Sequence, residues 1–321
     1  MKVDIDKHSG FCGGVIRAIK KAEGFLQENS DGHLYSLGAI VHNDAELARL
    51  HNLGLTTIDY EDLLQIDAAD SHSLLIRAHG EPPSTYKTAQ SKGFEIIDCT
   101  CPVVLDLQKS IREAHENFSA HNIKGQIIIF GQIGHAETLG LMGQAPDTIV
   151  IENMNMLKEA LKNGDINPSL PTEIFSQTTK SPSEFESVID FLEEEMAQAC
   201  GTTREELRQK GLLGVHNTIC TQVAARQARL SEFATCHDII IFVSGKASSN
   251  GKVLCSLCKN MNIRTYHIEK AEELRPEWFR QDDNVGVCGA TSTPRWLLEQ
   301  VADKILEIGE NLSNFASENK I

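Results

Sequence analysis

The segment Ile239-Ile240-Ile241-Phe242-Val243 is followed directly by the polar loop Ser244-Gly245-Lys246-Ala247-Ser248-Ser249-Asn250. An uninterrupted apolar run of this length, bounded by a turn, is typical of a strand buried on both faces, and the residues after Asn250 suit a helix. The same unit of apolar strand, small polar loop and amphipathic helix recurs along the chain. Strands that alternate with helices predict an α/β fold with parallel, helix-covered sheets.

Polar loops follow other strand-sized segments in the same way. They are Arg77–Glu81, Asp98–Pro102, Gly134–Glu137 and Gly286–Ser292. Ligands of open parallel sheets bind outside the carboxyl ends of the strands. We therefore expect the functional residues to lie in these loops.

The size and composition of the chain describe a folded globular protein. A length of 321 residues predicts two or three domains. The apolar runs are strand-sized, far short of the ~20 residues that span a bilayer, so we expect no membrane segment. Residues 1–7 alternate charged with apolar side chains, which predicts a first strand rather than a secretory signal. These features favour a cytoplasmic protein.

Charge and cysteine content narrow the possible functions. A formal net charge of −15 argues against a general nucleic-acid-binding protein, which needs a basic face. An anionic substrate would therefore need a local site of histidines, hydroxyl groups and helix-start N–H groups. Nine cysteines, an odd number in a chain of this size, favour free thiols, metal ligands or redox groups over a disulfide framework.

Three cysteines lie where a loop passes into an expected helix. Cys12 stands between Gly10-Phe11 and Gly13-Gly14, Cys101 precedes Pro102, and Cys220 precedes a helix-like run. A helix N-terminus favours the thiolate form, which binds metal. The separations between these cysteines far exceed the about two to four residues of ferredoxin motifs, so only tertiary folding could bring them together. Each one alone is equally compatible with a small buried thiol.

The remaining cysteines are weaker candidates. Cys255 and Cys258 form a CxxC motif, but no second pair completes a tetrahedral zinc site, and the apolar setting favours packing in a helix core. Cys200 and Cys236 are interpreted as structural or incidental thiols. Cys99 and Cys288 stand at strand ends, where either could border a site without binding metal.

Several short motifs then occur in a fixed order along the chain. They are Gly10–Val15, Val41–Asn43, Ala78–Gly80, Thr100–Val103, Gly134–Glu137 with Gly143-Gln144, Gln177–Thr179, Ile219-Cys220, Ser248–Asn250 and Ala290–Pro294. From about Val3 to about Ile308, the set resembles the LytB family of 4-hydroxy-3-methylbut-2-enyl diphosphate reductases. These enzymes catalyse the last step of the non-mevalonate isoprenoid pathway.

The resemblance implies a fold and a cofactor. It implies three similar α/β domains in a trefoil arrangement around a central iron-sulfur cluster, with residues 13–100 as the first domain, 101–216 as the second, and 1–12 with 217–321 as the third. By motif match, one [4Fe-4S] cluster has the ligands Cys12, Cys101 and Cys220 and one open iron. Cys99 stands where the family often has alanine, and strand alternation could point it to the side of Cys101. The motif match favours Cys101 as the ligand.

The resemblance also implies a reaction and a set of site residues. The reaction removes the allylic hydroxyl group of the substrate with two electrons and two protons, giving isopentenyl and dimethylallyl diphosphates. Glu137 matches the proton donor, and the other catalytic residues are Thr178 and His135. The expected substrate-binding residues are His42, His79, His135, Thr178, Ser248, Ser249, Asn250 and Ser292. Reduced ferredoxin or flavodoxin is the expected electron donor, and no nucleic-acid partner is expected.

Two other classes of protein fit parts of the pattern. A zinc hydrolase acting on a phosphate ester could use a His/Cys/Glu subset, although HExxH spacing is absent. A non-catalytic metabolite-binding protein could be built on the same strand-end loops. Anaerobically purified protein separates the three, because an iron-sulfur protein is brown whereas a zinc hydrolase is colourless with bound zinc.

Overall fold

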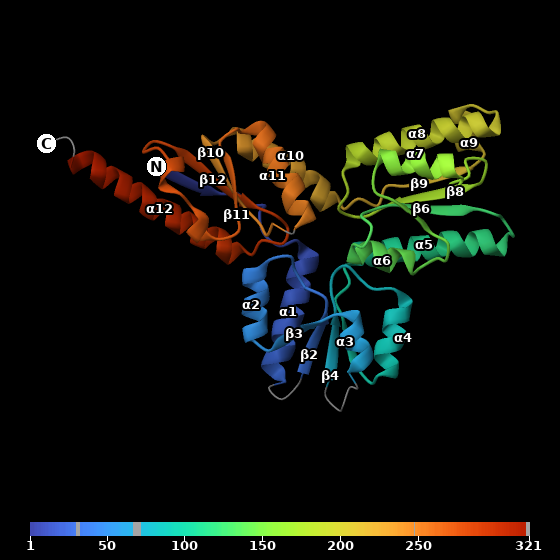
Figure 1. The fold of residues 1–321 in the computed structure, drawn as a ribbon, viewed down its shortest axis with the longest axis horizontal. Coiled ribbons are helices and arrows are strands. Elements are labelled where there is room, and N and C mark those ends of the chain that lie inside the picture. The colour runs from blue at the N-terminus through green and yellow to red at the C-terminus, as the bar shows by residue number, and fades with distance from the viewer. Residues whose placement is uncertain (30–32, 67–71, 247, 319–321) are drawn as a thin grey trace. The chain divides into compact units, whose positions relative to one another are not determined.

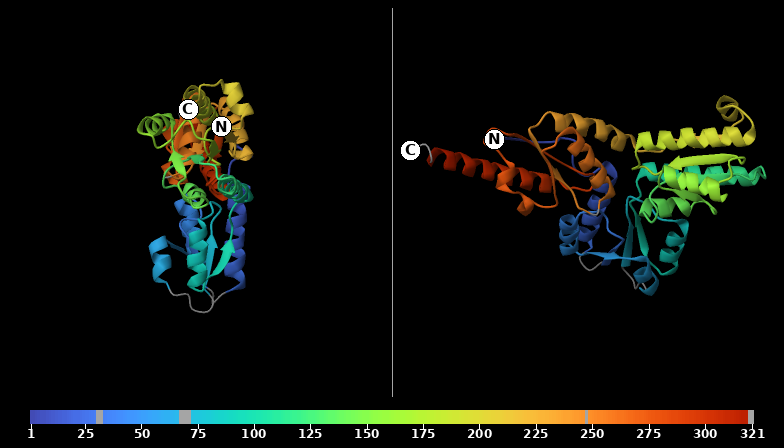
Figure 2. Two further views of the ribbon diagram at one scale, coloured as in Figure 1. Left: turned by 90° about the vertical axis from the view of Figure 1, so that its right-hand side faces the viewer. Right: turned by 45° about the horizontal axis from the view of Figure 1, so that its top comes forward.

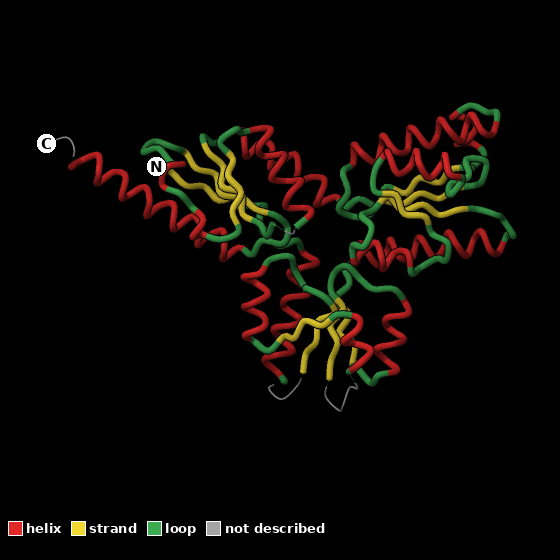
Figure 3. Tube along the Cα trace, viewed as in Figure 1, coloured by secondary structure: helices red, strands yellow, loops and turns green. Residues whose placement is uncertain are grey.

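The computed structural model describes residues 1–29, 33–66, 72–246 and 248–318, and only the backbone of Ser249 and of residues 313–318. The described strands form three sheets of four strands each (Figure 1). Every strand pairing with a recorded register is parallel. Helices stand between the strands along the chain, as Figure 3 shows. The predicted α/β class is therefore confirmed, and three separate parallel sheets are what a fold of three similar α/β domains requires.

The first sheet has the order β1-β12-β10-β11. Its strands are β1 (Lys2–Ile5), β12 (Asn284–Gly289), β10 (Ile239–Val243) and β11 (Thr265–Ile268). All five residues of β10 are buried, as the unbroken apolar run predicts for a central strand. The predicted N-terminal strand is also confirmed, as β1.

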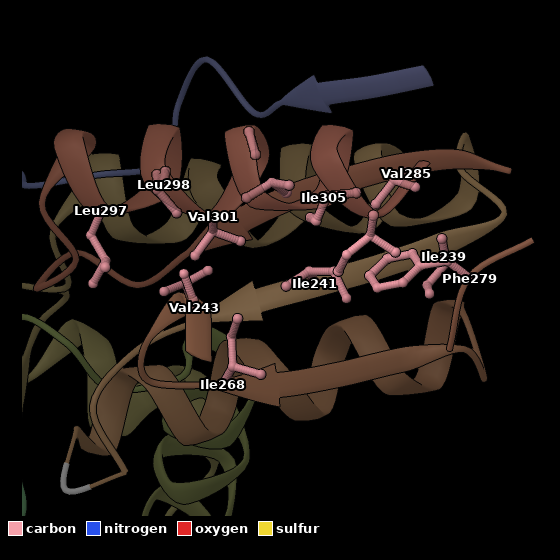
Figure 4. Packing of buried hydrophobic residues seen from close by; sticks show 14 residues of the cluster. Ile239, Ile241, Val243, Ile268, Phe279, Val285, Leu297, Leu298, Val301 and Ile305 are labelled. Carbon is pink, nitrogen blue, oxygen red and sulfur yellow. The ribbon is translucent and has the colours of Figure 1, made fainter. Parts of the chain in front are cut away.

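The helices next to this sheet along the chain are α10 (Thr221–Thr235), α11 (Ser249–Met261) and α12 (Arg295–Glu318), with two short 3-10 turns, Ala271–Glu273 and Pro276–Trp278. Residues of α12 at helical spacing bury an apolar stripe against alternate residues of β10 (Figure 4). The stripe is Leu297, Leu298, Val301 and Ile305, and the facing strand residues are Ile239, Ile241 and Val243. Burying each such side chain contributes roughly 1.5–3 kcal/mol to folding.

The second sheet has the order β3-β2-β4-β5. Its strands are β3 (Leu55–Ile58), β2 (His33–Leu37), β4 (His72–Ile76) and β5 (Glu95–Asp98). The helices in this part of the chain are α1 (Gly13–Glu28), α2 (Asp44–Asn52), α3 (Tyr60–Gln65) and α4 (Pro83–Ser91).

The third sheet has the order β7-β6-β8-β9, with strands β7 (Ile149–Ile151), β6 (Gln126–Phe130), β8 (Thr172–Ser176) and β9 (Leu213–His216). The helices α5 (Pro102–Ala120) and α6 (Ala136–Met142) cover one face, and α7 (Met154–Asn163) and α8 (Pro182–Cys200) cover the other (Figure 2). The side chains of successive residues of β6 point to opposite faces of the sheet. Ile127 and Ile129 pack with α5 and α6, whereas Ile128 and Phe130 pack with α7 and α8.

The predicted helix starts are confirmed near the end of this region. Ser181 caps α8 by accepting a hydrogen bond from the backbone N–H of Glu184. Thr203 caps the following helix, α9 (Arg204–Gln209), in a reciprocal capping box with Glu206.

The chain divides into two compact units. One comprises residues 1–30, 39–57 and 225–321, and contains the first sheet; the other comprises 31–38 and 58–224, and contains the third. The strands of each sheet fall within one of the three predicted domains, but the boundaries of those domains stay a prediction. Across the described residues, no helix combines the length and apolar character needed to cross a membrane.

Candidate active site

Two of the predicted cysteine ligands lie in the unit that contains the third sheet. Cys101 is the N-cap residue of α5, its backbone N–H donates to the carbonyl of Ala78 at 3.0 Å, and Pro102 occupies the first helical position. Cys220 stands directly before α10, and its N–H donates to the carbonyl of Thr178 at 2.9 Å. Both thiols are free and partly exposed. A partly exposed thiol at a helix start is the setting that favours metal-binding thiolate.

Thr178 joins Cys220 to the predicted proton donor in this same unit. Its backbone N–H donates to one carboxyl oxygen of Glu137 at 2.7 Å, and its hydroxyl group donates to the other at 2.8 Å. The carboxyl group of Glu137 is therefore held at both oxygens. Because the carbonyl of Thr178 accepts a hydrogen bond from Cys220, a single residue connects the Glu137 carboxyl group to a predicted cysteine ligand.

The burial of Glu137 makes it an acid suited to neutral pH. Its side chain is only 1% exposed. Burial raises the pKa of Glu137 to about 7, although the two hydrogen bonds from Thr178 act in the opposite direction. An acid whose pKa lies near the working pH is protonated often enough to donate and can still release its proton readily.

His135 is oriented by a glutamine that the sequence reasoning did not assign to the site. His135 caps α6, and its ring Nδ1 accepts a hydrogen bond from the backbone N–H of Glu137 at 3.2 Å. Gln177 Nε2 lies 3.1 Å from the same nitrogen, and Gln177 Oε1 accepts from the backbone N–H of Gln132 at 2.8 Å. An Nδ1 atom that accepts leaves the proton of the neutral ring on Nε2. In the sequence, the position of Gln177 directly before Thr178, a predicted site residue, was the feature that could have indicated its role.

The structure also places His79 beside His135. Their ring centroids lie 5.2 Å apart with the planes perpendicular. His79 follows Ala78, the residue whose carbonyl accepts from Cys101, so the loop after β4 is tied to the start of α5. Of the predicted site residues, this unit therefore contains Cys101, Cys220, His79, His135, Glu137 and Thr178.

In the other unit, the loops after two neighbouring strands form a group of hydroxyl and amide side chains. Ser248, the N-cap of α11 after β10, accepts a hydrogen bond from the backbone N–H of Gly251 at 3.0 Å. The hydroxyl of Ser292, after β12, donates to the hydroxyl oxygen of Ser248 at 3.3 Å. Asn250 donates to Thr291 at 2.8 Å. Ser249 begins α11, but its side chain lies outside the described residues.

Cys12 and His42 belong to this same unit. Cys12 is the N-cap of α1, and its carbonyl accepts the first helical hydrogen bond, from Ile16. His42 precedes Asn43, the N-cap of α2. A Cβ atom at Gly245 would lie 2.7 Å from the carbonyl oxygen of His42, so only glycine lets the loop before Ser248 approach His42 this closely.

Burial distinguishes four of the other cysteines, Cys99, Cys255, Cys258 and Cys288, from the three predicted ligands. Cys99 is fully buried, whereas Cys101 is partly exposed. Burial and the neighbouring Cys258 raise the pKa of the Cys288 thiol well above its usual value, which disfavours the metal-binding thiolate. Cys255 and Cys258 lie buried in an apolar cluster of α11, so the prediction that this CxxC motif is core packing is confirmed.

The fold and these side chains define an α/β protein with a buried carboxyl group near thiols at helix starts and with hydroxyl and amide side chains at strand ends. The comparisons with known proteins make the class specific: it is an oxidoreductase. The model of the LytB protein family matches residues 3–306. The chain belongs to this family.

Relatives and solved structures agree with the family. A 4-hydroxy-3-methylbut-2-enyl diphosphate reductase from Bacteroides thetaiotaomicron is 44% identical over 95% of this chain and 98% of its own length. The reductase of the same name from Porphyromonas gingivalis is 43% identical over 94% and 98%. A solved reductase described as the terminal enzyme of the non-mevalonate pathway shares the fold with a TM-score of 0.68 and 34% identity, covering 96% of this chain and 100% of its own. The Plasmodium falciparum reductase shares it with a TM-score of 0.74 and 25% identity, covering 96% and 86%.

Proposed function

We propose that the protein reduces 4-hydroxy-3-methylbut-2-enyl diphosphate to isopentenyl and dimethylallyl diphosphates, the last step of the non-mevalonate pathway. The match to the LytB family along nearly the whole chain supports this substrate. The observation that carries the chemistry is the buried carboxyl group of Glu137, which accepts hydrogen bonds from Thr178 at both oxygens. The carbonyl of the same Thr178 accepts a hydrogen bond from the N–H of Cys220. The match to the reductase family, added to this acid, favours a reductase over a zinc hydrolase or a simple binding protein.

The three cysteines at helix starts, Cys12, Cys101 and Cys220, fit an iron-sulfur cluster, since thiolates are its usual ligands. We propose that they hold one [4Fe-4S] cluster. Three protein ligands on four irons leave one iron open, and the bound cluster would supply electrons and a Lewis acid for the substrate hydroxyl group.

Glu137 supplies the proton that makes the hydroxyl group a leaving group. Hydroxide leaves poorly, so protonation by a positioned acid lowers the barrier to C–O cleavage. Once Glu137 has given up its proton, the two hydrogen bonds from Thr178 stabilise the carboxylate that remains. Gln177 keeps His135 in one orientation, and His135 in turn accepts from the backbone of Glu137.

The diphosphate group is bound by neutral donors and imidazoles rather than by a basic patch, in keeping with the acidic chain. The hydroxyl oxygen of Ser248 accepts from Gly251 and from Ser292, which leaves the proton of Ser248 to donate to an anion. Asn250, Ser249 and the first N–H groups of α11 follow in the same loop. We assign His42, His79 and His135 as further ligands of the substrate.

We also propose a cellular compartment, an electron donor and domain boundaries for the enzyme. A protein that keeps thiols reduced for a cluster belongs in the cytoplasm. Reduced ferredoxin or flavodoxin is the electron donor that we propose. The three domains would have the boundaries predicted from the sequence, with Cys12 directly before the first domain, Cys101 at the start of the second and Cys220 near the start of the segment 217–321 of the third.

An anaerobic assay tests this function. With reduced methyl viologen, a one-electron dye, we expect two viologens oxidised for each substrate molecule consumed, with isopentenyl and dimethylallyl diphosphates as products. Iron-loaded protein that leaves the substrate intact would overturn the proposal. Release of inorganic phosphate by colourless, zinc-containing protein would support a hydrolase instead.

A further inference from the structure

Arg226 is a buried cation that the proposed reaction does not use. It lies on α10 and is 7% exposed. A buried guanidinium group is costly unless it is well hydrogen-bonded and near negative charge. The carboxylate of Asp6 is nearby, but it accepts from the backbone N–H of His8 at 3.1 Å and from the Ser9 hydroxyl at 2.7 Å.

The guanidinium group bonds to two backbone carbonyls instead. It donates to the carbonyl of Gly10 at 3.1 Å and to that of Gly289 at 2.8 Å. Gly10 lies two residues before Cys12, and Gly289 ends β12 just before the loop of Ser292. A single side chain thus connects the loop that carries Cys12 to the strand end that leads to a predicted substrate-binding serine.

The loop before Cys12 has an uncommon backbone conformation, and hydrogen bonds to Arg226 and Gly289 hold it in place. Gly10 has a φ of +120°, a backbone conformation that other residues rarely adopt. The Ser9 hydroxyl adds a second tie by accepting from the N–H of Gly289 at 2.9 Å. Arg226 still has a buried Nε that makes no hydrogen bond to any described residue.

The charge of Arg226 also acts on its surroundings. Burial lowers the pKa of Arg226, while the nearby Asp6, Cys288 and Cys12 raise it. Arginine stays protonated in proteins, so a positive charge persists here in a place where water screens it weakly. The potential of an iron-sulfur cluster depends on the charge and hydrogen bonds around its ligands.

We infer that Arg226 is a positioning residue for Cys12: it holds the Gly10 carbonyl so that the thiol is placed to bind iron, and its buried charge raises the reduction potential of the cluster. This inference rests on the proposed function, because it needs a cluster bound through Cys12. It predicts two separable effects, one on cluster retention and one on potential.

Variants at this position separate the two effects. Arg226→Lys keeps the charge but cannot span both carbonyls, so we expect a near-normal midpoint potential and about 10-fold faster loss of iron to a chelator. Arg226→Met loses both features, so we expect a more negative midpoint potential and iron loss at least as fast. Arg229→Met is the matched control. It removes the same charge one turn further along α10, from an exposed side chain that lies 3.5 Å from the ring of His8, and it should change neither quantity.

Iron release and a redox titration of reconstituted, anaerobic protein measure both effects without turnover. Arg226→Met that matches Arg229→Met in potential and in iron release would overturn the inference while leaving the proposed function intact. If Arg226→Met does not fold, the Lys variant alone decides, because iron release at the wild-type rate would show that the two-carbonyl bridge does not hold Cys12. Wild-type protein that binds no iron would overturn the proposed function and this inference together.

Discussion

The Glu137→Gln variant is expected to retain its iron and bind substrate, but to turn over about 100- to 10,000-fold more slowly than wild-type protein. Glutamine keeps the shape of the buried side chain and can still accept from the N–H of Thr178, but it has no proton to give to the leaving hydroxyl group. The measurement is anaerobic turnover together with iron content and substrate affinity. Glu152→Gln is the matched control, since this partly buried carboxylate of the same unit accepts from the N–H of Ile133 and has no proposed part in the reaction.

The pH profile shows whether Glu137 is the titrating acid. Because its pKa is raised to about 7, the protonated form is lost as pH rises through about 7, and wild-type turnover should fall with it. This alkaline limb should be absent from the residual activity of Glu137→Gln. Near-normal turnover of the variant, or an unchanged limb, would remove Glu137 from the proton path.

The pH dependence of folding stability tests the raised pKa of Glu137 independently of turnover. Between pH 4.5 and about 7 the unfolded chain ionises Glu137 while the folded protein keeps it protonated, so the folded state loses stability as pH rises through this window. The full cost above pH 7 is about 3 kcal/mol. Glutamine does not ionise, so Glu137→Gln should resist denaturant better than wild-type protein at pH 8, and the difference should vanish near pH 4.

Of the neighbouring cysteines Cys99 and Cys101, we expect Cys101 to be required for the cluster and Cys99 to be dispensable. Cys101→Ser should lose most of its iron after anaerobic reconstitution, because Cys101 is the partly exposed thiol at the start of α5. Cys99→Ser should keep it, because Cys99 is fully buried. Cys236→Ser, at an exposed thiol outside both proposed sites, is the control for handling losses.

Iron and sulfide content decide between the two cysteines. A cluster lost from Cys99→Ser and kept in Cys101→Ser would reverse the ligand assignment. Iron content at the wild-type level in both variants would mean that neither thiol is a ligand, and the motif match would have misplaced the second domain's cysteine.

The sequence predicted the parts of the site that depend on strand order. Ser248 and Ser292 lie 44 residues apart along the chain, yet their hydroxyl groups form a hydrogen bond because β10 and β12 are neighbours in a parallel sheet. The strand–loop pattern predicted that functional residues lie in both of these loops, and the family resemblance selected the two serines within them. The three cysteines also lie at helix starts, as their flanking residues indicated.

Residues that act through tertiary contacts were missed. Gln177 orients His135 across two strand ends, and an amide side chain in a polar motif gives no signal of its partner. Nothing in the sequence around Arg226 indicates its burial, which comes from tertiary contacts with Gly10, in the loop between β1 and α1, and with Gly289 at the end of β12. The preference for Cys101 over Cys99 came from family resemblance, and burial now gives it a physical reason.

The most direct test is a Mössbauer spectrum of anaerobically prepared, iron-57-labelled protein, recorded with and without substrate. A cluster held by Cys12, Cys101 and Cys220 should give one iron site distinct from the other three, and the signal of that site alone should change when substrate binds. Four equivalent irons that do not respond to substrate, or protein that contains zinc in place of iron, would contradict a catalytic cluster with an open position.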